Sequence, residues 1–154
     1  MNFKPILLVA GEPNSIFLEI FFKVHKKNKF KSPLILIASK KVLNLQMKKL
    51  NFNKKIRFLN PQKLNSYKLN NKTINLIDIK YNPSKAFEKI SNKSKNYIKD
   101  CFNTAIKIIN SGYTYKLVNG PISKKDFLNK KFPGITEYLA DKFKKKNFAM
   151  LIYN

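Results

Sequence analysis

The sequence is poor in the residues from which catalytic and metal sites are usually built. Its 154 residues include one cysteine, one histidine, four glycines and no tryptophan. A single cysteine excludes an internal disulfide and is consistent with a reducing compartment. Cys101 and His25 are too few for a zinc site rich in Cys or His, and no glycine-rich loop of the Walker or dinucleotide type occurs. The sequence therefore carries no local signature of these chemistries.

Long apolar runs are also missing. The run over residues 33–38 is far too short to span a bilayer, and residues 5–10 lead into Gly11-Glu12-Pro13 instead of a signal-peptide cleavage site. An apolar content of 44% nevertheless argues for a packed core, and the length fits one domain. We predict a cytoplasmic protein with no membrane partner.

Acidic residues are few, and arginine is almost absent. Eight Asp and Glu oppose 32 basic residues, which gives a formal net charge of +24, and Arg57 is the only arginine. Proteins that read nucleic acid rely on arginine for bidentate contacts, whereas these lysines are scattered among Asn and Ile over the whole chain. We interpret them as solvated surface residues, so a nucleic-acid partner is disfavoured. A non-catalytic basic protein that binds nucleic acid or acidic partners stays open as the alternative.

Apolar periodicity predicts strands that alternate with helices. Strands are expected over residues 4–10, 33–39, 55–59, 73–79, 116–119 and 148–153. Helices are expected over residues 16–26, 40–50, 82–109, 124–130 and 136–145. In the first helix Ile16, Ile20 and Val24 share one face, and Ser111-Gly112 would end the third. The alternation indicates an α/β fold with a mainly parallel sheet.

Three of the four glycines lie in loops that also contain proline. These loops are Gly11-Glu12-Pro13, Asn119-Gly120-Pro121 and Phe132-Pro133-Gly134. Glycine allows backbone conformations closed to other residues and proline fixes φ, so such pairs specify loop geometry. The first two loops follow predicted strands, and ligands of parallel sheets bind beyond the carboxyl ends of strands. We predict that both loops face the ligand-binding edge.

Each candidate functional residue also has a plain structural reading. Glu12 and Glu19 are candidates, although Glu12 could form an ordinary salt bridge; Lys124 could be a solvated lysine. Thr136 and Glu137 are candidates too, although Thr136 could be the N-cap of a helix that begins at Glu137. Asp78 could be a site carboxylate or could cap a loop. His25 is predicted to be a surface residue, and Cys101 a small core residue and not a nucleophile.

Taken together, the three loops resemble the N-terminal half of the 4-hydroxythreonine-4-phosphate dehydrogenase family of pyridoxal phosphate biosynthesis. Gly11-Glu12-Pro13, with Ile16 and Glu19, resembles the family's opening Gly-Glu-Pro-x-Gly-Ile-Gly-Pro-Glu. The run Asn119-Gly120-Pro121-Ile122-Ser123-Lys124 resembles its Thr-Gly-Pro-x-x-Lys loop, and Pro133-Gly134-Ile135-Thr136-Glu137 resembles its Pro-Gly-His-Thr-Glu segment.

The resemblance implies an activity and a fold. The family oxidises the secondary hydroxyl of 4-phosphohydroxy-L-threonine with NAD, and the product then loses CO2. A divalent metal (Zn, Mg or Co) held by histidines acts as a Lewis acid. A close variant would act on phosphothreonate or phosphoerythronate. The family is a homodimer with a three-layer α/β/α fold like that of the isocitrate and isopropylmalate dehydrogenases, and it lacks a glycine-rich dinucleotide fingerprint.

By the same resemblance, Thr136 would contact substrate, with Ile135 in place of the family's histidine. Site-loop candidates are Glu12, Gly120, Pro121, Lys124, Gly134 and Glu137. The family's metal ligands lie beyond Asn154, so no metal ligand and no catalytic residue is assigned here. Ser15, Phe17 and Leu18 replace two glycines and a proline of the family's opening loop and should stiffen and crowd it. We expect residues 1–154 to be one incomplete, truncated α/β unit of a two-domain dehydrogenase and to be inactive alone.

Overall fold

The computed structural model describes residues 3–27, 30–128 and 131–151. Strands and helices alternate along them, with two short 3-10 turns and a π-helical turn at Lys124–Leu128. The strands are β1 (Ile6–Val9), β2 (Leu34–Ala38), β3 (Ile56–Phe58), β4 (Ile74–Asp78) and β5 (Lys116–Asn119). The helices are α1 (Phe17–Lys27), α2 (Lys40–Lys49), α3 (Lys95–Asn110) and α4 (Ile135–Lys142). The predicted strands up to residue 119 are all present.

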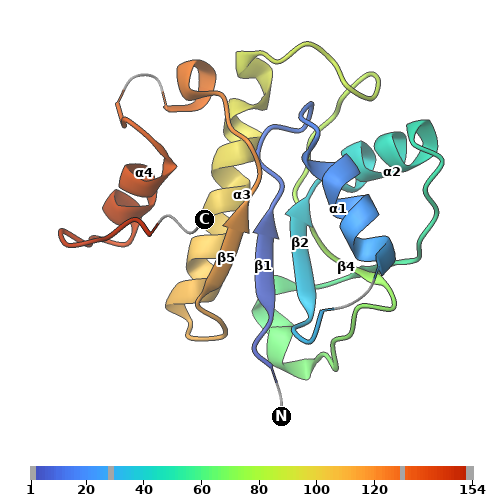
Figure 1. The fold of residues 1–154 in the computed structure, drawn as a ribbon, viewed down its shortest axis with the longest axis horizontal. Coiled ribbons are helices and arrows are strands. Elements are labelled where there is room, and N and C mark those ends of the chain that lie inside the picture. Colours follow the sequence, from blue (N-terminus) through green and yellow to red (C-terminus); the bar gives the residue numbers. More distant parts are fainter. Residues whose placement is uncertain (1–2, 28–29, 129–130, 152–154) are drawn as a thin grey trace.

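All five strands form one parallel sheet in the order β3-β4-β2-β1-β5. The central strand β2 consists of Leu34-Ile35-Leu36-Ile37-Ala38 and is buried along its whole length. A parallel sheet covered on both faces favours such unbroken apolar strands. The carboxyl ends of the strands point to one edge, at the top of Figure 1.

Helices cover the two faces of the sheet and produce three layers. Leu7, Val9, Ile35 and Ile37 pack with α3 on one face. On the other face Leu8 and Leu36 pack with α1 and α2, and Figure 1 shows α3 behind the strands with α1 and α2 in front. The alternation of side chains along each strand divides the core in this way. The predicted α/β/α fold is confirmed.

The predicted start of the third helix near Asn82 is wrong, because α3 begins at Lys95. Residues 79–91 are irregular and cross the carboxyl edge of the sheet (Figure 1). Here the Glu88 carboxylate accepts hydrogen bonds from the backbone N–H groups of Ser84 and Lys85, and Phe87 has a φ of 58°. Backbone groups held by side chains in this way compete with helix formation.

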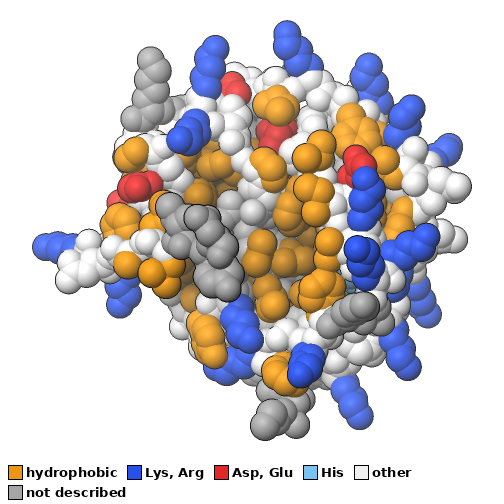
Figure 2. Space-filling view, viewed as in Figure 1, with side chains coloured by type: hydrophobic (Ala, Val, Ile, Leu, Met, Phe, Trp, Pro, Cys, Tyr) orange, Lys and Arg blue, Asp and Glu red, His pale blue; other side chains and the backbone are white. Residues whose placement is uncertain are grey.

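The apolar face predicted for the first helix is the exposed one. Ile16, Ile20 and Val24 are 60%, 48% and 38% exposed, whereas Leu18, Phe21, Phe22 and His25 form the buried face. The prediction of a surface His25 is therefore also wrong, since this residue is 2% exposed. Figure 2 shows hydrophobic side chains gathered over β1 and the adjacent side of α1.

The C-terminal part departs from prediction in three places. Residues 148–151 form no strand, and the rest of the predicted strand lies outside the described residues. The helix predicted over residues 124–130 is a π-helical turn that ends at Leu128, and positions 129–130 are not described. The N-cap of α4 is Gly134, not Thr136. Of the helices described, none has the length and hydropathy needed to cross a bilayer.

Candidate functional site

The first two glycine–proline loops meet at the carboxyl edge of the sheet. β1 and β5 are paired in parallel, so Gly11 and Gly120 leave neighbouring strands side by side. The backbone N–H of Glu12 donates to the Pro121 carbonyl at 2.8 Å, and that of Gly120 donates to Val9 at 2.7 Å. Two loops more than 100 residues apart in sequence are thus joined at the carboxyl ends of β1 and β5. The predicted strands place both loops at this edge.

Glycine is required on both sides of this contact. Gly11 has a φ of 71°, and a Cβ there would overlap the Pro121 carbonyl oxygen. A Cβ on Gly120 would overlap the Ala10 carbonyl oxygen and lie 2.8 Å from the Phe17 ring. The expected crowding of the opening loop by Phe17 is therefore visible as a ring placed against Gly120.

Glu12 is buried, and its carboxylate is held by neutral donors. The side chain is 2% exposed; Oε2 accepts from the Ser94 hydroxyl at 2.8 Å and Oε1 from the backbone N–H of Asn14 at 3.2 Å. No salt bridge to Glu12 occurs among the described residues, although the chain has 31 lysines, so the salt-bridge interpretation is wrong. Hydrogen bonds to the charged form compensate burial of a carboxylate.

Three residues that hold this loop were not found by sequence reasoning. Ser94 reaches Glu12 from the turn before α3, Asn14 accepts from the backbone N–H of Glu88 at 3.0 Å, and Gln46 donates from α2 to the Pro13 carbonyl at 2.7 Å. Their partners are 82, 74 and 33 residues away in sequence, so no local pattern marks them. Together they bind the loop to α2 and to residues 79–94.

Ile135 and Thr136 lie apart from Glu12. They begin α4 and line a groove of about 600 Å³ beside β5, together with Leu117, Asn119 and Leu139. Most of its other lining residues are also apolar. The structure therefore brings together Glu12, Gly120 and Pro121 at one place, and Ile135 and Thr136 with Asn119 at another.

The remaining predicted site residues lie on several different elements. Lys124 begins the π-helical turn and is exposed. Gly134 precedes α4, and Glu137 lies in its first turn, where a negative charge favours the helix dipole. Glu19 pairs with Lys23 on the surface of α1 at 2.7 Å. Asp78 accepts from the backbone N–H of Lys40 at 2.7 Å, which is the loop-capping role.

The described residues do not supply a metal centre. Within residues 3–27, 30–128 and 131–151 no three His, Cys, Asp or Glu side chains gather as ligands would. His25 lies on the buried face of α1, with its ring centroid 5.1 Å from that of Phe21 and the two rings tilted by 56°. Cys101 is fully buried in α3, and burial raises the pKa of its thiol to about 12, so it is a core residue as predicted.

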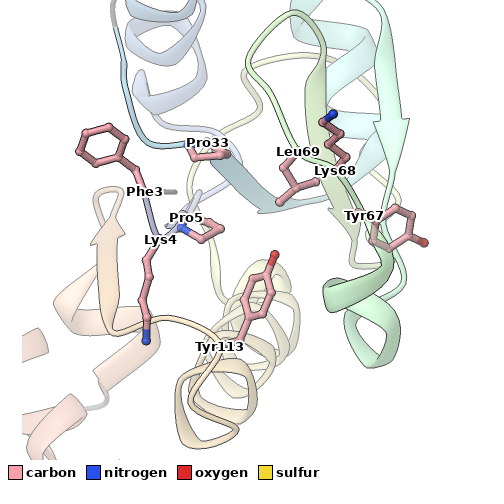
Figure 3. Close-up of a pocket in the computed structure, with 8 residues that line it drawn as sticks. All are labelled: Phe3, Lys4, Pro5, Pro33, Tyr67, Lys68, Leu69 and Tyr113. Atoms are coloured by element: carbon pink, nitrogen blue, oxygen red, sulfur yellow. The ribbon is translucent and has the colours of Figure 1, made fainter. Parts of the chain in front are cut away.

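Two further pockets are lined by no residue of the three glycine–proline loops. One, of about 510 Å³, lies at the amino edge of the sheet, where Figure 3 shows Pro5, Pro33, Leu69 and Tyr113 around it. The other, of about 360 Å³, lies at the ends of β2 and β4 beside Lys40, Lys41 and Lys80. Ligands of parallel sheets bind at the carboxyl edge, which disfavours the first pocket.

Solved structures share this fold. A putative 4-hydroxythreonine-4-phosphate dehydrogenase from Salmonella typhimurium matches 99% of the chain at 21% identity with a TM-score of 0.81. Enzymes of that name from Klebsiella pneumoniae and Burkholderia phymatum match 98% and 94% of the chain, at 19% identity, with TM-scores of 0.78 and 0.76. The chain spans 49%, 47% and 44% of the length of these three proteins. No curated protein matches it.

A family model matches most of the sequence. It is that of the pyridoxal phosphate biosynthetic protein PdxA, and the match covers residues 29–154. This range includes the loops around Gly120 and Gly134 but not the loop around Gly11. The chain belongs to the PdxA family.

Proposed function

We propose that the chain is the N-terminal part of an NAD- and divalent-metal-dependent dehydrogenase that oxidises the secondary hydroxyl of 4-phosphohydroxy-L-threonine, with loss of CO2 from the product, in pyridoxal phosphate biosynthesis. The observation that carries the proposal is the meeting of the Gly11 and Gly120 loops within the fold of the PdxA family. The names of the three structural relatives support the dehydrogenase part of this proposal, since two are 4-hydroxythreonine-4-phosphate dehydrogenases and one is a putative member of that class.

In this proposal the described residues form one wall of a site. The hydrogen bond from the Glu12 N–H to the Pro121 carbonyl joins the two loops, and the buried Glu12 side chain orients the first loop through Ser94. Lys124 is exposed, three residues after Pro121, and can offer its ammonium group to a phosphate. Thr136 offers a hydroxyl to the substrate from the start of α4, where the neighbouring Ile135 offers neither a hydrogen bond nor a proton.

NAD would supply the hydride chemistry and the metal would polarise the substrate oxygen. The described residues hold neither a metal-ligand cluster nor a glycine-rich phosphate loop. Ligands for both groups would come from polypeptide equivalent to the half of the relatives that this chain does not span. We therefore propose that residues 1–154 are an incomplete unit of a two-domain, homodimeric cytoplasmic enzyme and do not catalyse the reaction alone.

The substrate could instead be phosphothreonate or phosphoerythronate, because the described residues do not distinguish these hydroxy acids. The basic-protein alternative gains no specific support. In Figure 2 the lysines are distributed around the outline of the molecule and do not gather in one patch. Long-range attraction of polyanions by the charge of +24 needs no dedicated site.

The test is a comparison of two polypeptides: residues 1–154, and the product of the reading frame that contains them, read to its stop codon. Each is supplied with NAD, one of Zn²⁺, Mg²⁺ or Co²⁺, and one of the three phosphorylated hydroxy acids. NADH formation is followed by absorbance. We expect none from residues 1–154, and turnover of 4-phosphohydroxy-L-threonine if the reading frame continues into the second half.

NADH formed by residues 1–154 alone would contradict their incompleteness. A longer product that turns over none of the three acids would contradict the dehydrogenase. A stop codon directly after Asn154 would exclude catalysis by this gene product alone.

A further inference from the structure

The pocket at the ends of β2 and β4 lies between two neighbouring strands whose following helices cover opposite faces of the sheet. After β2 the chain turns into α2 on one face, and after β4 it crosses to α3 on the other face (Figure 1). In open parallel sheets a crevice forms at the carboxyl ends of two such strands, and ligands bind in it. The pocket of about 360 Å³ occupies this position.

Hydrogen bonds between the two strand ends hold this pocket in shape. The backbone N–H of Ile79 donates to the Ala38 carbonyl at 3.0 Å, and the Ser39 hydroxyl donates to the Tyr81 carbonyl at 3.1 Å. Both walls of the pocket are therefore fixed to each other in the free protein. A site that is formed in advance loses little conformational freedom when a ligand binds.

The pocket carries an excess of positive charge. Three lysines line it: Lys40, Lys41 and Lys80. None of the three forms a salt bridge within the described residues. Lys41 Nζ donates to Asn82 Oδ1 at 3.3 Å, which leaves the ammonium charge in place. Asp78 supplies the one carboxylate of the described lining, so two positive charges are not compensated.

The lysine side chains, and not the end of a helix, are the groups that a ligand would meet. The backbone N–H groups at the start of α2 already have acceptors, because Ser39 Oγ accepts from the N–H of Lys41 at 3.2 Å and Asp78 accepts from that of Lys40 at 2.7 Å. The three lysine side chains are exposed. Most other lysines are spread around the molecule in Figure 2, whereas these three share one pocket.

We propose that this pocket binds a small phosphorylated molecule, held by the ammonium groups of Lys40, Lys41 and Lys80. A phosphate monoester carries about −1.5 to −2 charges near pH 7, which matches the uncompensated charge of the pocket, and its oxygens accept several hydrogen bonds. Charge-assisted bonds of this kind are stronger than neutral ones. The proposal does not depend on the proposed dehydrogenase activity.

The rest of the lining favours a polar ligand. The amide groups of Asn44 and Asn82 can donate to further ligand oxygens. Tyr81 is the one aromatic residue that the described chain contributes to this pocket, and no aliphatic residue of that part lines it. A nucleobase or an acyl chain would therefore find few apolar contacts. These residues favour a small phosphorylated compound over a nucleotide or a lipid.

Calorimetric titration of the whole chain with inorganic pyrophosphate tests the proposal, at a fixed ionic strength of about 0.1 M. Replacing any one of the three pocket lysines by Gln should weaken binding about tenfold, and replacing all three should abolish it. The matched control replaces Lys31, Lys72 and Lys99, which are exposed outside the pocket, and lowers the net charge equally. We expect the control to bind within about threefold of the parent, because salt screens distant charges.

A second variant keeps every lysine. Asn44→Asp adds a negative charge at the pocket and should also weaken pyrophosphate binding about tenfold, whereas Asn53→Asp, exposed beyond the end of α2, should not. Hydrogen exchange locates the ligand: pyrophosphate should slow exchange over residues 79–82 and leave the amide of Gly120 unchanged.

A parent chain that does not bind pyrophosphate overturns the proposal. So does an equal loss of binding in the pocket and control triple variants, since the net charge alone would then attract the anion. ADP should bind no more tightly than pyrophosphate, because its base gains few contacts. An affinity for ADP that is about tenfold higher would overturn the small ligand in favour of a nucleotide.

Discussion

At the scale of single residues, the contact between Gly120, Ala10 and Phe17 decides whether the two site loops can meet. A methyl group on Gly120 would overlap a backbone carbonyl oxygen and approach the Phe17 ring to 2.8 Å. The ring can rotate away, but the carbonyl belongs to the end of β1 and cannot move without opening the sheet. The constraint is therefore steric and comes mainly from the backbone.

Gly120→Ala should lower the free energy of unfolding by about 1–3 kcal/mol, the usual cost of overpacking. Adding Phe17→Leu should recover only part of the loss, because the overlap with Ala10 persists. Urea unfolding of the two variants measures this. Gly112→Ala is the control: no heavy atom lies within 4 Å of its Cβ, so only its φ of 76° costs energy, about 1 kcal/mol. Equal losses for Gly120→Ala and Gly112→Ala would show that the loops can separate.

His25 makes the stability depend on pH. Burial lowers the pKa of His25 below its ordinary value of 6.5, and the charge of Lys54 adds to this effect. Its Nδ1 atom has no hydrogen-bond partner among the described residues. The unfolded chain then binds the proton more readily than the folded chain. The contribution of neutral His25 to the free energy of unfolding is therefore fully present above pH 6.5. It is lost as the pH falls from this value toward the lower pKa of the folded state.

The expected slope from this one group is at most about 1.4 kcal/mol per pH unit. Urea unfolding at about pH 7 and about pH 5 measures it, since histidine titrates in this range. His25→Phe keeps an aromatic ring beside Phe21 and removes the titrating group, so its stability should fall less across the same interval. Parallel curves for the two proteins would assign the acid sensitivity to other groups.

At the scale of elements, residues 79–94 cross the carboxyl edge of the sheet and are attached to the Gly11 loop by few contacts. Ser94 donates to Glu12, and the Glu88 N–H donates to Asn14. Tyr81 lies against Tyr97 of α3, with the ring centroids 5.0 Å apart. The attachment of this segment therefore depends on the buried carboxylate of Glu12.

Ser94→Ala removes one of the two described donors to this carboxylate and should cost about 1–3 kcal/mol. Exchange of the amides over residues 85–94 should become faster, while those of β2 stay protected. Ser91→Ala is a matched control, since the Ser91 side chain makes no capping hydrogen bond. If both variants exchange alike, Glu12 does not hold the segment.

Sequence patterns were sufficient for elements whose partners are implied by their own composition. The buried run of β2 needs an apolar layer on each side, and any parallel sheet provides it. The irregular segment before α3 could not be predicted, because its N–H groups are held by Asn14 and Glu88, which no local pattern links. Nor does periodicity alone choose between two apolar faces of α1 or provide a neighbour for residues 148–151.

The site shows the same division. Gly11 and Gly120 could be placed together because each follows a strand and parallel strands end at one edge. The burial of Glu12 could not be predicted, because it depends on Ser94, 82 residues away in sequence. The separation of Thr136 from Glu12 could not be predicted either, because it depends on how α4 packs beside β5.

At the scale of the whole molecule, charge opposes compactness. The net charge is +24, and the described residues form two ion pairs, Lys23–Glu19 and Lys142–Asp141, both on the surface. Exposed pairs of this kind contribute little to stability. The folded state therefore concentrates like charges that the unfolded chain keeps further apart.

Raising NaCl from about 0.05 M to about 0.5 M should therefore raise Tm by about 2–4 °C, which corresponds to about 1 kcal/mol for a chain of this size. Calorimetry at the two salt concentrations measures this. Replacing exposed Lys31, Lys72 and Lys99 by Gln should raise Tm at the lower salt concentration and reduce the response to salt. A Tm that is indifferent to salt in both proteins would mean that the lysines are spaced widely enough for water alone to screen them.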